Sequence, residues 1–342
     1  MDRVSQAVKE LVEEIQRMPE APDPAETDRH AFTLLLSGIA ACRRAPGIPC
    51  HMGYRTLYRC GDEPASEELK AHLFRLYGIY DRESLEKVCM EQFTSGREYE
   101  QFMTFWCDAP LFDLEELEEK GRRAFETRFK RASLFRPYVG ERGFYAWDIN
   151  ERIGLGRLAC ACGIIDRETF DELTDYQVRK AQVFYHTFKD YAVSCICGAV
   201  YDVPGGDEED MLSILDLNKK LALHLLEEGG AWYRNAWYAP EKREWVSLLP
   251  HNGGCIVSKQ IEEGRAIGYM YRDSRPSEQW ADTGWRFFAG DESDEYSRNP
   301  DNFTIWSLND ICNLDATILG YAEAKEGSAF GRNAKGEWQR ER

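Results

Sequence analysis

Histidine and the familiar catalytic signatures are what this sequence has least of. Its 342 residues include only 6 histidines, and no two of them stand at a metal-ligand spacing. There is no His-Glu-x-x-His, no phosphate-binding P-loop, no Gly-x-Ser-x-Gly and no dinucleotide-binding glycine pattern after a strand. We therefore expect no catalytic residues, no metal and no cofactor, and interpret the protein as a non-enzyme.

Long apolar runs and a positive net charge are also missing. The longest apolar run, residues 31–42, is much shorter than the roughly 20 residues of a membrane-spanning helix. The first five residues have no apolar signal-peptide core. The net charge of −17 repels a nucleic-acid backbone and attracts a basic protein, although it also serves solubility alone. We expect a cytoplasmic protein with neither a membrane nor a nucleic-acid partner.

Cysteine, in contrast, is plentiful, with 11 residues that we expect to be reduced thiols in the cytoplasm. Two Cys-x-Cys pairs, Cys160/Cys162 and Cys195/Cys197, invite a metal-site interpretation. Both pairs lie in helical sequence, where residues two apart point in different directions. Their neighbours are small, so we interpret all four as close-packing core residues.

The chain changes character near residue 250, which predicts two domains. Residues 1–248 form long charged segments with helical spacing, and we expect an all-α domain there. Residues 249–342 have short strand-like runs broken by Gly, Pro, Asn and Asp, which predicts a small α+β domain with an antiparallel sheet. The expected helices cover residues 2–18, 26–45, 113–132, 147–162, 167–189, 191–201 and 210–228.

A sequence pattern that occurs twice supports the prediction of a helical domain. Residues 77–88 and 162–173 share a pattern in which Gly78 and Gly163 supply a left-handed helix end. An aspartate three residues later then caps the next helix. A duplication and a convergence of two helical corners both explain the repeated pattern. Either origin predicts a helical bundle rather than a catalytic motif.

Three polar or aromatic residues of the helical domain mark a candidate ligand pocket. A ligand site would lie between the helices around Asp148, Arg157 and Tyr191, with a buried Asp–Arg pair as the structural alternative. The domain junction near Trp232 and Trp237 is the other candidate place. We expect these tryptophans, with Trp245, to pack that junction.

The C-terminal domain is expected to have strands near 254–259, 266–272, 284–289 and 303–307, and a helix at 309–314. Within Trp285-Arg-Phe-Phe288, alternation places Trp285 and Phe287 on one face and Arg286 and Phe288 on the other. The segment 291–302 is expected to be an exposed loop.

The C-terminal sequence resembles a bacterial immunity-protein family, number thirty-three in the immunity series, also called domain of unknown function 2185. The resemblance is carried by Cys255-Ile-Val-Ser-Lys259, by Ile267-Gly-Tyr-Met-Tyr-Arg272 and by Asp282-Thr-Gly-Trp-Arg-Phe-Phe-Ala-Gly-Asp-Glu292. It continues through Asn299-Pro-Asp-Asn302 and Gly327-Ser-Ala-Phe330. The order and spacing of these motifs hold over nearly the whole tail.

The helical part resembles domain of unknown function 1266 through Trp147-Asp148, Arg157 and Gly163. Two arginines usual in that family are replaced here by Glu151 and Ala199, which weakens the transfer of a polar site. That family implies no activity. The immunity resemblance implies that the chain binds and neutralises a polymorphic toxin.

Such a protein works by covering a toxin surface, and an acidic inhibitor suits a basic toxin. The candidate partner-binding residues are Arg272, Arg286, Asp291, Glu292, Asp294 and Glu295. Asp291 has a structural alternative, which is to cap its own turn. Two other functions stay open: an enzyme or small-ligand sensor with a site in the helical domain or at the junction, and a helical scaffold that carries a binding tail.

Overall fold

The computed structural model describes residues 2–43, 53–93, 118–203, 207–240, 245–249, 253–273 and 281–341. These residues divide into two compact units, 2–240 and 245–341. Each unit has a hydrophobic core of its own. The domain limit that the sequence suggests between residues 248 and 249 stays a prediction.

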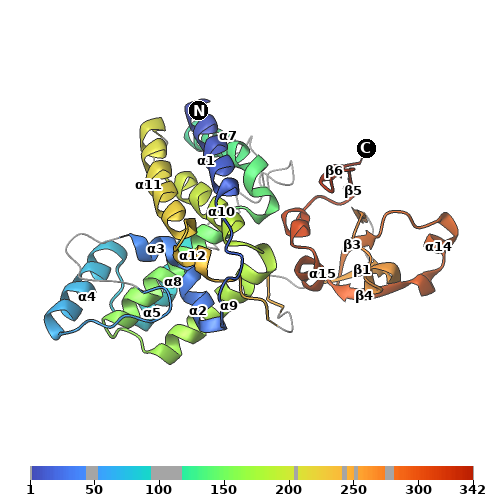
Figure 1. The fold of residues 1–342 in the computed structure, drawn as a ribbon. Coiled ribbons are helices and arrows are strands. Elements are labelled where there is room, and N and C mark those ends of the chain that lie inside the picture. Colours follow the sequence, from blue (N-terminus) through green and yellow to red (C-terminus); the bar gives the residue numbers. More distant parts are fainter. Residues whose placement is uncertain are drawn as a thin grey trace. The chain divides into compact units, whose positions relative to one another are not determined.

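The first unit is helical, as expected. Helices α1, α7, α10 and α11 lie side by side (Figure 1). On α1 the predicted apolar stripe is buried at Val4, Val8, Leu11 and Ile15. The described helices are α1 (Asp2–Arg17), α2 (Arg29–Leu36), α3 (Gly38–Cys42), α4 (Glu63–Tyr77), α5 (Arg82–Phe93), α7 (Glu119–Val139), the 3-10 turn η2 (Gly140–Arg142), α8 (Tyr145–Ala161), α9 (Arg167–Phe184), α10 (Phe188–Tyr201), α11 (Glu208–Leu226) and α12 (Ala231–Arg234).

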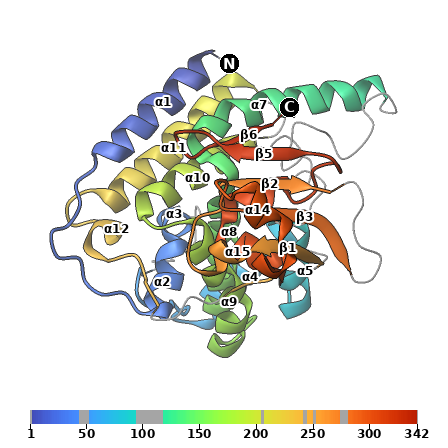
Figure 2. The same ribbon diagram turned by 90° about the vertical axis from the view of Figure 1, so that its right-hand side faces the viewer.

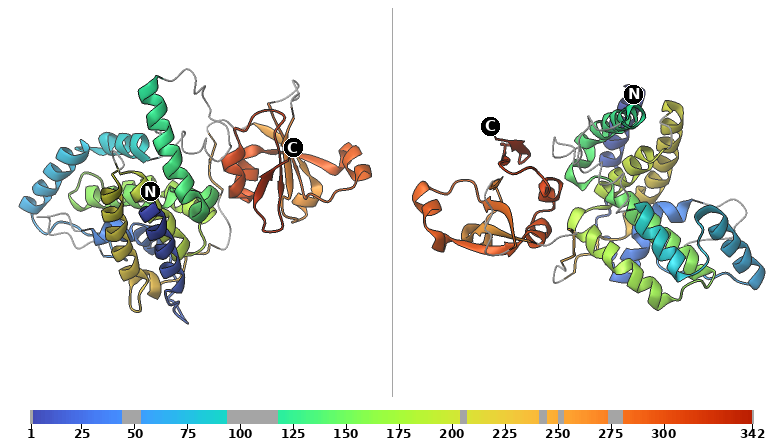
Figure 3. Two further views of the ribbon diagram at one scale, coloured as in Figure 1. Left: turned by 90° about the horizontal axis from the view of Figure 1, so that it is seen from above. Right: turned by 180° about the vertical axis from the view of Figure 1, so that it is seen from behind.

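Helix α8 is the centre of this unit. Nearly every one of its residues is buried, as expected for a helix that is surrounded by others. It contacts α9 and α10, and α4 and α5 lie beside it (Figure 3). Small residues allow close approach, because a Cβ at Gly154 would stand 2.7 Å from the Cβ of Ala40 on α3. The central position of α8 explains why its polar residues are buried.

The two predicted helical corners are confirmed. Gly78 ends α4 with φ of 71° and Gly163 follows α8 with φ of 77°, both in the left-handed region. Asp166 caps α9 by accepting the N–H of Thr169 at 2.9 Å. Ile79 is fully buried, which is the hydrophobic contact expected after such a helix end.

Several predicted helix limits are wrong. The single helix expected over 26–45 is divided at Ser37 into α2 and α3, and residues 44 and 45 lie outside the described residues. The helix expected at 113–132 continues to Val139, and residues 113–117 also lie outside the described residues. The helix expected at 167–189 ends at Phe184. There Tyr185 is extended, and Thr187 caps the next helix.

The Cys-x-Cys pairs are core residues, as predicted. Cys160, Cys162, Cys195 and Cys197 are all buried, and all four are free thiols. Burial raises the pKa of each thiol above its ordinary value. These thiols therefore pack as small side chains in the helical core.

The second unit is an α+β domain built on one six-stranded sheet (Figure 2). Its elements are β1 (Gly254–Ser258), α13 (Lys259–Glu262), β2 (Tyr269–Arg272), β3 (Asp282–Phe288), α14 (Asp294–Arg298), the 3-10 turn η3 (Pro300–Asn302), β4 (Phe303–Ser307), α15 (Leu308–Leu314), the 3-10 turn η4 (Ala316–Tyr321), β5 (Ala329–Arg332) and β6 (Trp338–Arg340). The four expected strands and the expected helix are present; β4 has the expected limits, and the ends of the others are shifted. The strands β5 and β6 and the short helix α14 are additional.

The strand order is β4-β1-β3-β2-β5-β6. The sheet is mostly antiparallel, as expected, and β1 and β3 run parallel within it. Alternation works as predicted, since Trp285 and Phe287 are fully buried while Phe288 is half-buried on the opposite face. Arg286 lies on that opposite face, although it is itself only 7% exposed.

The close approach of α8 and α10 gives a test of the helical packing. A Cβ at Gly198 would stand 2.4 Å from the Cβ of Trp147 and 3.0 Å from that of Phe144, so Gly198→Ala should overpack this contact. We expect a loss of about 1–3 kcal/mol in the free energy of unfolding, measured with urea. Gly61→Ala is the matched control, because a Cβ there meets nothing within 4 Å. Equal midpoints for the two variants would contradict the packing argument.

Candidate functional site

The candidate pocket residues Arg157 and Tyr191 meet at the end of α2, where they bond backbone rather than a ligand. Where the helix divides, the N–H and the hydroxyl of Ser37 bond the carbonyl of Leu34, and further donors to this last turn come from other helices. The guanidinium of Arg157 donates to the carbonyl of Leu34 at 3.1 Å and to Ser37 Oγ at 2.9 Å. The hydroxyl of Tyr191 donates to the carbonyl of Leu36 at 2.7 Å.

Trp232 completes this group, because its Nε1–H donates to the carbonyl of Leu35 at 2.9 Å. Arg157 also donates to the carbonyl of Gly53. Arg157 is 2% exposed, and burial lowers the pKa of its guanidinium to about 10. Three side chains thus serve three consecutive carbonyls, Leu34, Leu35 and Leu36, and we call this arrangement the carbonyl clamp.

Two of the three tryptophans expected at the domain junction pack against aromatic rings of the helical unit. The ring of Trp232 stacks on Phe188 at 5.5 Å, inside the helical unit. Trp237 packs against Phe32 at 4.7 Å in the same unit. Trp245, in the second unit, is 41% exposed. Trp232 and Trp237 therefore pack within the helical unit, and their place at a domain junction stays a prediction.

Asp148 lies away from the carbonyl clamp. It stands nine residues before Arg157 on α8, and nine residues at 100° each place two side chains on opposite faces of a helix. Asp148 is 8% exposed, and its Oδ2 has no hydrogen-bond partner among the described residues. Burial raises the pKa of its carboxyl to about 8, against the opposing effects of Lys180 and Arg152.

Lys180 on α9 is the cation that faces Asp148. It is 4% exposed, and its ammonium lies 3.7 Å from the ring centroid of Tyr145, a cation–π geometry. Burial lowers the pKa of Lys180 to about 7, while the nearby Asp148 opposes the shift. Asp148, Arg152 and Lys180 thus form a buried titratable cluster, whereas Arg157 and Tyr191 bond the carbonyls at the end of α2.

An open groove of about 860 Å³ lies elsewhere on the helical unit. Its charged lining residues are Asp23, Glu26, Arg55 and Arg234. Neither the carbonyl clamp nor Asp148 lines this groove. Sequence reasoning missed the groove because its residues come from separate loops and the short helix α12, with no motif between them.

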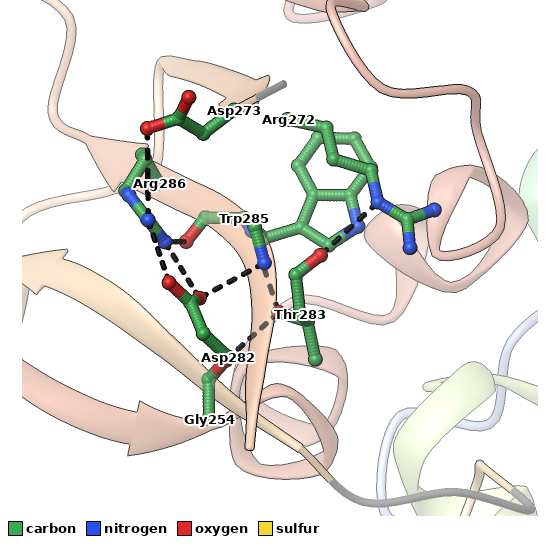
Figure 4. Close-up of polar contacts among 8 residues, drawn as sticks. Gly254, Arg272, Asp273, Asp282, Thr283, Trp285 and Arg286 are labelled. Atoms are coloured by element: carbon green, nitrogen blue, oxygen red, sulfur yellow. Dashed lines mark hydrogen bonds and ion pairs between the residues drawn. The ribbon is translucent and has the colours of Figure 1, made fainter. Parts of the chain in front are cut away.

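In the C-terminal domain the most buried charged pair is Asp282–Arg286, both on β3 (Figure 4). The two guanidinium nitrogens of Arg286 reach the two carboxylate oxygens of Asp282 at 2.9 and 2.8 Å. The side chain of Asp282 is 0% exposed and that of Arg286 is 9% exposed. These hydrogen bonds raise the pKa of Arg286. The charge of its guanidinium is paired with Asp282 inside the domain.

Arg272 and Glu292 are also used within the fold. Arg272 donates to the carbonyl of Thr283 at 3.1 Å and to the carbonyl of Ala324 at 2.6 Å. Glu292 accepts the backbone N–H groups of Ala289 at 2.7 Å and Gly290 at 2.8 Å. Glu292 therefore caps the turn, a role that the sequence analysis left open as an alternative for Asp291.

Asp291, Asp294 and Glu295 are exposed. The guanidinium of Arg265 pairs with Asp291 at 2.7 Å and lowers the pKa of that carboxyl. Asp294 and Glu295 begin α14, whose cap Ser293 accepts the N–H of Tyr296 at 3.1 Å. Of the six candidate partner-binding residues, these three can face a partner. Partner contact by any of the six stays a prediction.

We call residues 291–302 the acidic arm. It carries five acidic residues against one arginine, Arg298. Most of it is exposed, as predicted, although it contains α14 and η3 rather than loop alone. Tyr296 anchors it, because its hydroxyl donates to the carbonyl of Asn302 at 3.2 Å and its ring lies 6.0 Å from that of Phe303.

Comparison with known protein families gives two matches. Residues 255–342 match the family described as Immunity protein Imm33 domain, and residues 72–237 match Protein of unknown function (DUF1266). Both resemblances seen in the sequence are confirmed. No curated protein and no solved structure matches the chain. The Imm33 match indicates an immunity-type, non-enzymatic role for the second unit, which implies a protein partner.

The described residues contain neither a membrane-spanning helix nor a cluster of metal ligands. No described helix is both long and apolar enough to cross a membrane. No group of three or more His, Cys, Asp or Glu in the described part of the chain could hold a metal ion.

The buried cluster predicts a pH-dependent stability. A carboxyl with a folded pKa near 8 and an unfolded value of about 4 holds more protons when folded, so the free energy of unfolding falls as pH rises between those values. Lys180 acts in the opposite sense above about pH 7. Asp148→Asn should therefore flatten the decline between pH 5 and 7 in urea unfolding. The exposed-residue control Asp216→Asn should keep the wild-type slope, and an unflattened Asp148→Asn curve contradicts the assignment.

The Asp282–Arg286 pair predicts a large cost for removing one partner alone. Arg286→Met leaves a carboxylate that is 0% exposed without its main cation, and should cost about 3–5 kcal/mol in chemical unfolding. The double variant Asp282→Asn/Arg286→Met should recover part of that loss. Additive effects of the two single substitutions in a double-mutant cycle would show that the pair is not coupled.

Proposed function

We propose that this chain is a cytoplasmic immunity-type protein whose C-terminal domain binds and neutralises a basic toxin. The observation that carries the proposal is the Imm33 match, which runs through all six strands of the second unit. The nine described cysteines are free thiols, which suits a reducing compartment.

The charge of the domain supports a basic partner. Residues 251–342 hold 11 basic and 16 acidic residues, a net charge of −5. The acidic arm accounts for −4 of this, with five acidic residues and one arginine. Opposite charge speeds association and disfavours wrong partners.

Neutralisation by covering a toxin surface requires a rigid surface and no catalytic group. The domain supplies rigidity, since Trp285 is fully buried and its Nε1–H donates to the carbonyl of Ala322 at 3.0 Å. Glu292 and Tyr296 hold the acidic arm against this core. The arm can therefore present Asp294 and Glu295 with little loss of conformational entropy on binding.

A second candidate is a small-ligand role for the helical domain. The observation that favours it is the open groove, where arginines and carboxylates line one surface. The Asp148 cluster is closed by packing, so the groove is the better place for a ligand. Toxin neutralisation by the C-terminal domain does not depend on it.

The exposed carboxylates at the start of α14 give a binding test. Asp294→Asn/Glu295→Gln should weaken toxin binding about 5- to 30-fold, mainly through a slower on-rate at low salt, with little change in melting temperature. Glu323→Gln/Glu326→Gln makes the same charge change at exposed positions outside the arm and is the matched control. If both variants weaken toxin binding equally, the acidic arm contributes only through the net charge of the domain and is not a contact surface.

The function itself is tested by co-expression of the full chain with the toxin domain encoded beside its gene. We expect the chain to restore growth and to form a complex that survives size-exclusion chromatography. Continued toxicity at equal expression, together with no complex between the purified proteins, overturns the proposal.

A further inference from the structure

Strand β4 has an open edge. It is the first strand in the sheet order and pairs with β1 on one side only, within the described part of the chain. The N–H of Leu308 bonds the carbonyl of Gly253 at 2.9 Å, which fixes the alternation of the ladder. The backbone groups of Thr304 and Trp306 therefore face β1, while those of Ile305 face outward.

This edge has none of the features that usually protect an edge strand. The sequence Phe303-Thr-Ile-Trp-Ser307 has no charge and no proline, and its pairing with β1 is regular over all five residues. The side chain of Ile305 is 60% exposed. The opposite edge is different, because β6 is three residues long and ends with the exposed Arg340.

The outward groups of β4 form a short template. The N–H and carbonyl of Ile305 lie at its centre, with the carbonyl of Phe303 and the N–H of Ser307 on either side. The N–H of Phe303 is not available, because it bonds the carbonyl of Pro300. An added strand would therefore be centred opposite Ile305, and Ile305 would pack on its side chains.

We infer that β4 takes an extended segment of the toxin as a seventh strand, and that this segment carries lysine or arginine next to the acidic arm. The inference rests on the proposed function. The arm leads directly into β4 at Phe303, so Asp301 and the carboxylates of α14 stand at one end of the template. Backbone bonds would supply the pairing, and the charge would select the segment and its direction.

A second copy of this chain is a poorer occupant of the same edge. Each copy carries −17, and pairing β4 with β4 brings two acidic arms onto one extended sheet. Like charges across an interface oppose association. A basic segment is attracted to the acidic arm, and this charge complementarity favours a toxin segment over a second copy of the chain.

The test separates backbone pairing from side-chain contact at one position. Ile305→Pro removes the outward N–H and should weaken binding of the full chain to the toxin domain that it neutralises about 10- to 100-fold. Ile305→Ala keeps that N–H and should lose less than Ile305→Pro. Arg340→Pro removes an outward N–H at the opposite edge, on β6, and should bind like wild type.

Hydrogen exchange on the wild-type complex gives a second readout that needs no variant. The amide of Ile305 should become protected when the toxin domain binds, while that of Arg340 should not. Equal losses for Ile305→Pro and Ile305→Ala without this protection overturn strand addition and leave the immunity function intact. If the wild-type chain does not bind the toxin domain and the amide of Ile305 stays unprotected, both strand addition and the immunity function are overturned. If the wild-type chain is a dimer that Ile305→Pro dissociates, the edge of β4 belongs to a second copy.

Discussion

The carbonyl groups of Leu34, Leu35 and Leu36 need hydrogen-bond donors inside the protein, and the helical unit is arranged around that need. Buried carbonyls without donors cost about 1–3 kcal/mol each. At the break, Ser37 bonds the carbonyl of Leu34 through its own N–H and hydroxyl, and Arg157, Trp232 and Tyr191 add donors from distant helices. These donors come from α8, α12 and α10. Segments almost 200 residues apart in sequence are thereby held at one point.

The same requirement accounts for the charge that is buried there. An arginine is an expensive residue to bury, and burial lowers its pKa, but its five donors fit several carbonyls at once. In the C-terminal domain the cost of burying Arg286 is offset by a carboxylate on its own strand, to which its guanidinium is paired. Two residues that sequence reasoning assigned to ligands or partners, Arg157 and Arg286, thus hold the fold together.

Residue patterns predicted the parts of the fold that depend on local spacing. The left-handed glycines after α4 and α8, the stripe of α1 and the burial of Trp285 and Phe287 all follow from periodicity or backbone chemistry. The break at Ser37 could not be predicted, since apolar spacing continues through it and its donors are distant in sequence. The parallel pairing of β1 with β3 is equally non-local. Site residues were hardest, because a surface arginine and a buried one look alike in a sequence.

The acidity of the chain and the open edge of β4 belong together physically. An unprotected apolar edge strand is a template for aggregation in most proteins, and its usual remedy is a charge on the strand itself. Here the strand has no charge, and the acidic arm before it carries five carboxylates. Repulsion between arms opposes the pairing of two copies, whereas a basic segment is attracted to the same place. Placing the charge beside β4 instead of on it therefore protects the edge from other copies of the chain and leaves its backbone groups available to a partner of opposite charge.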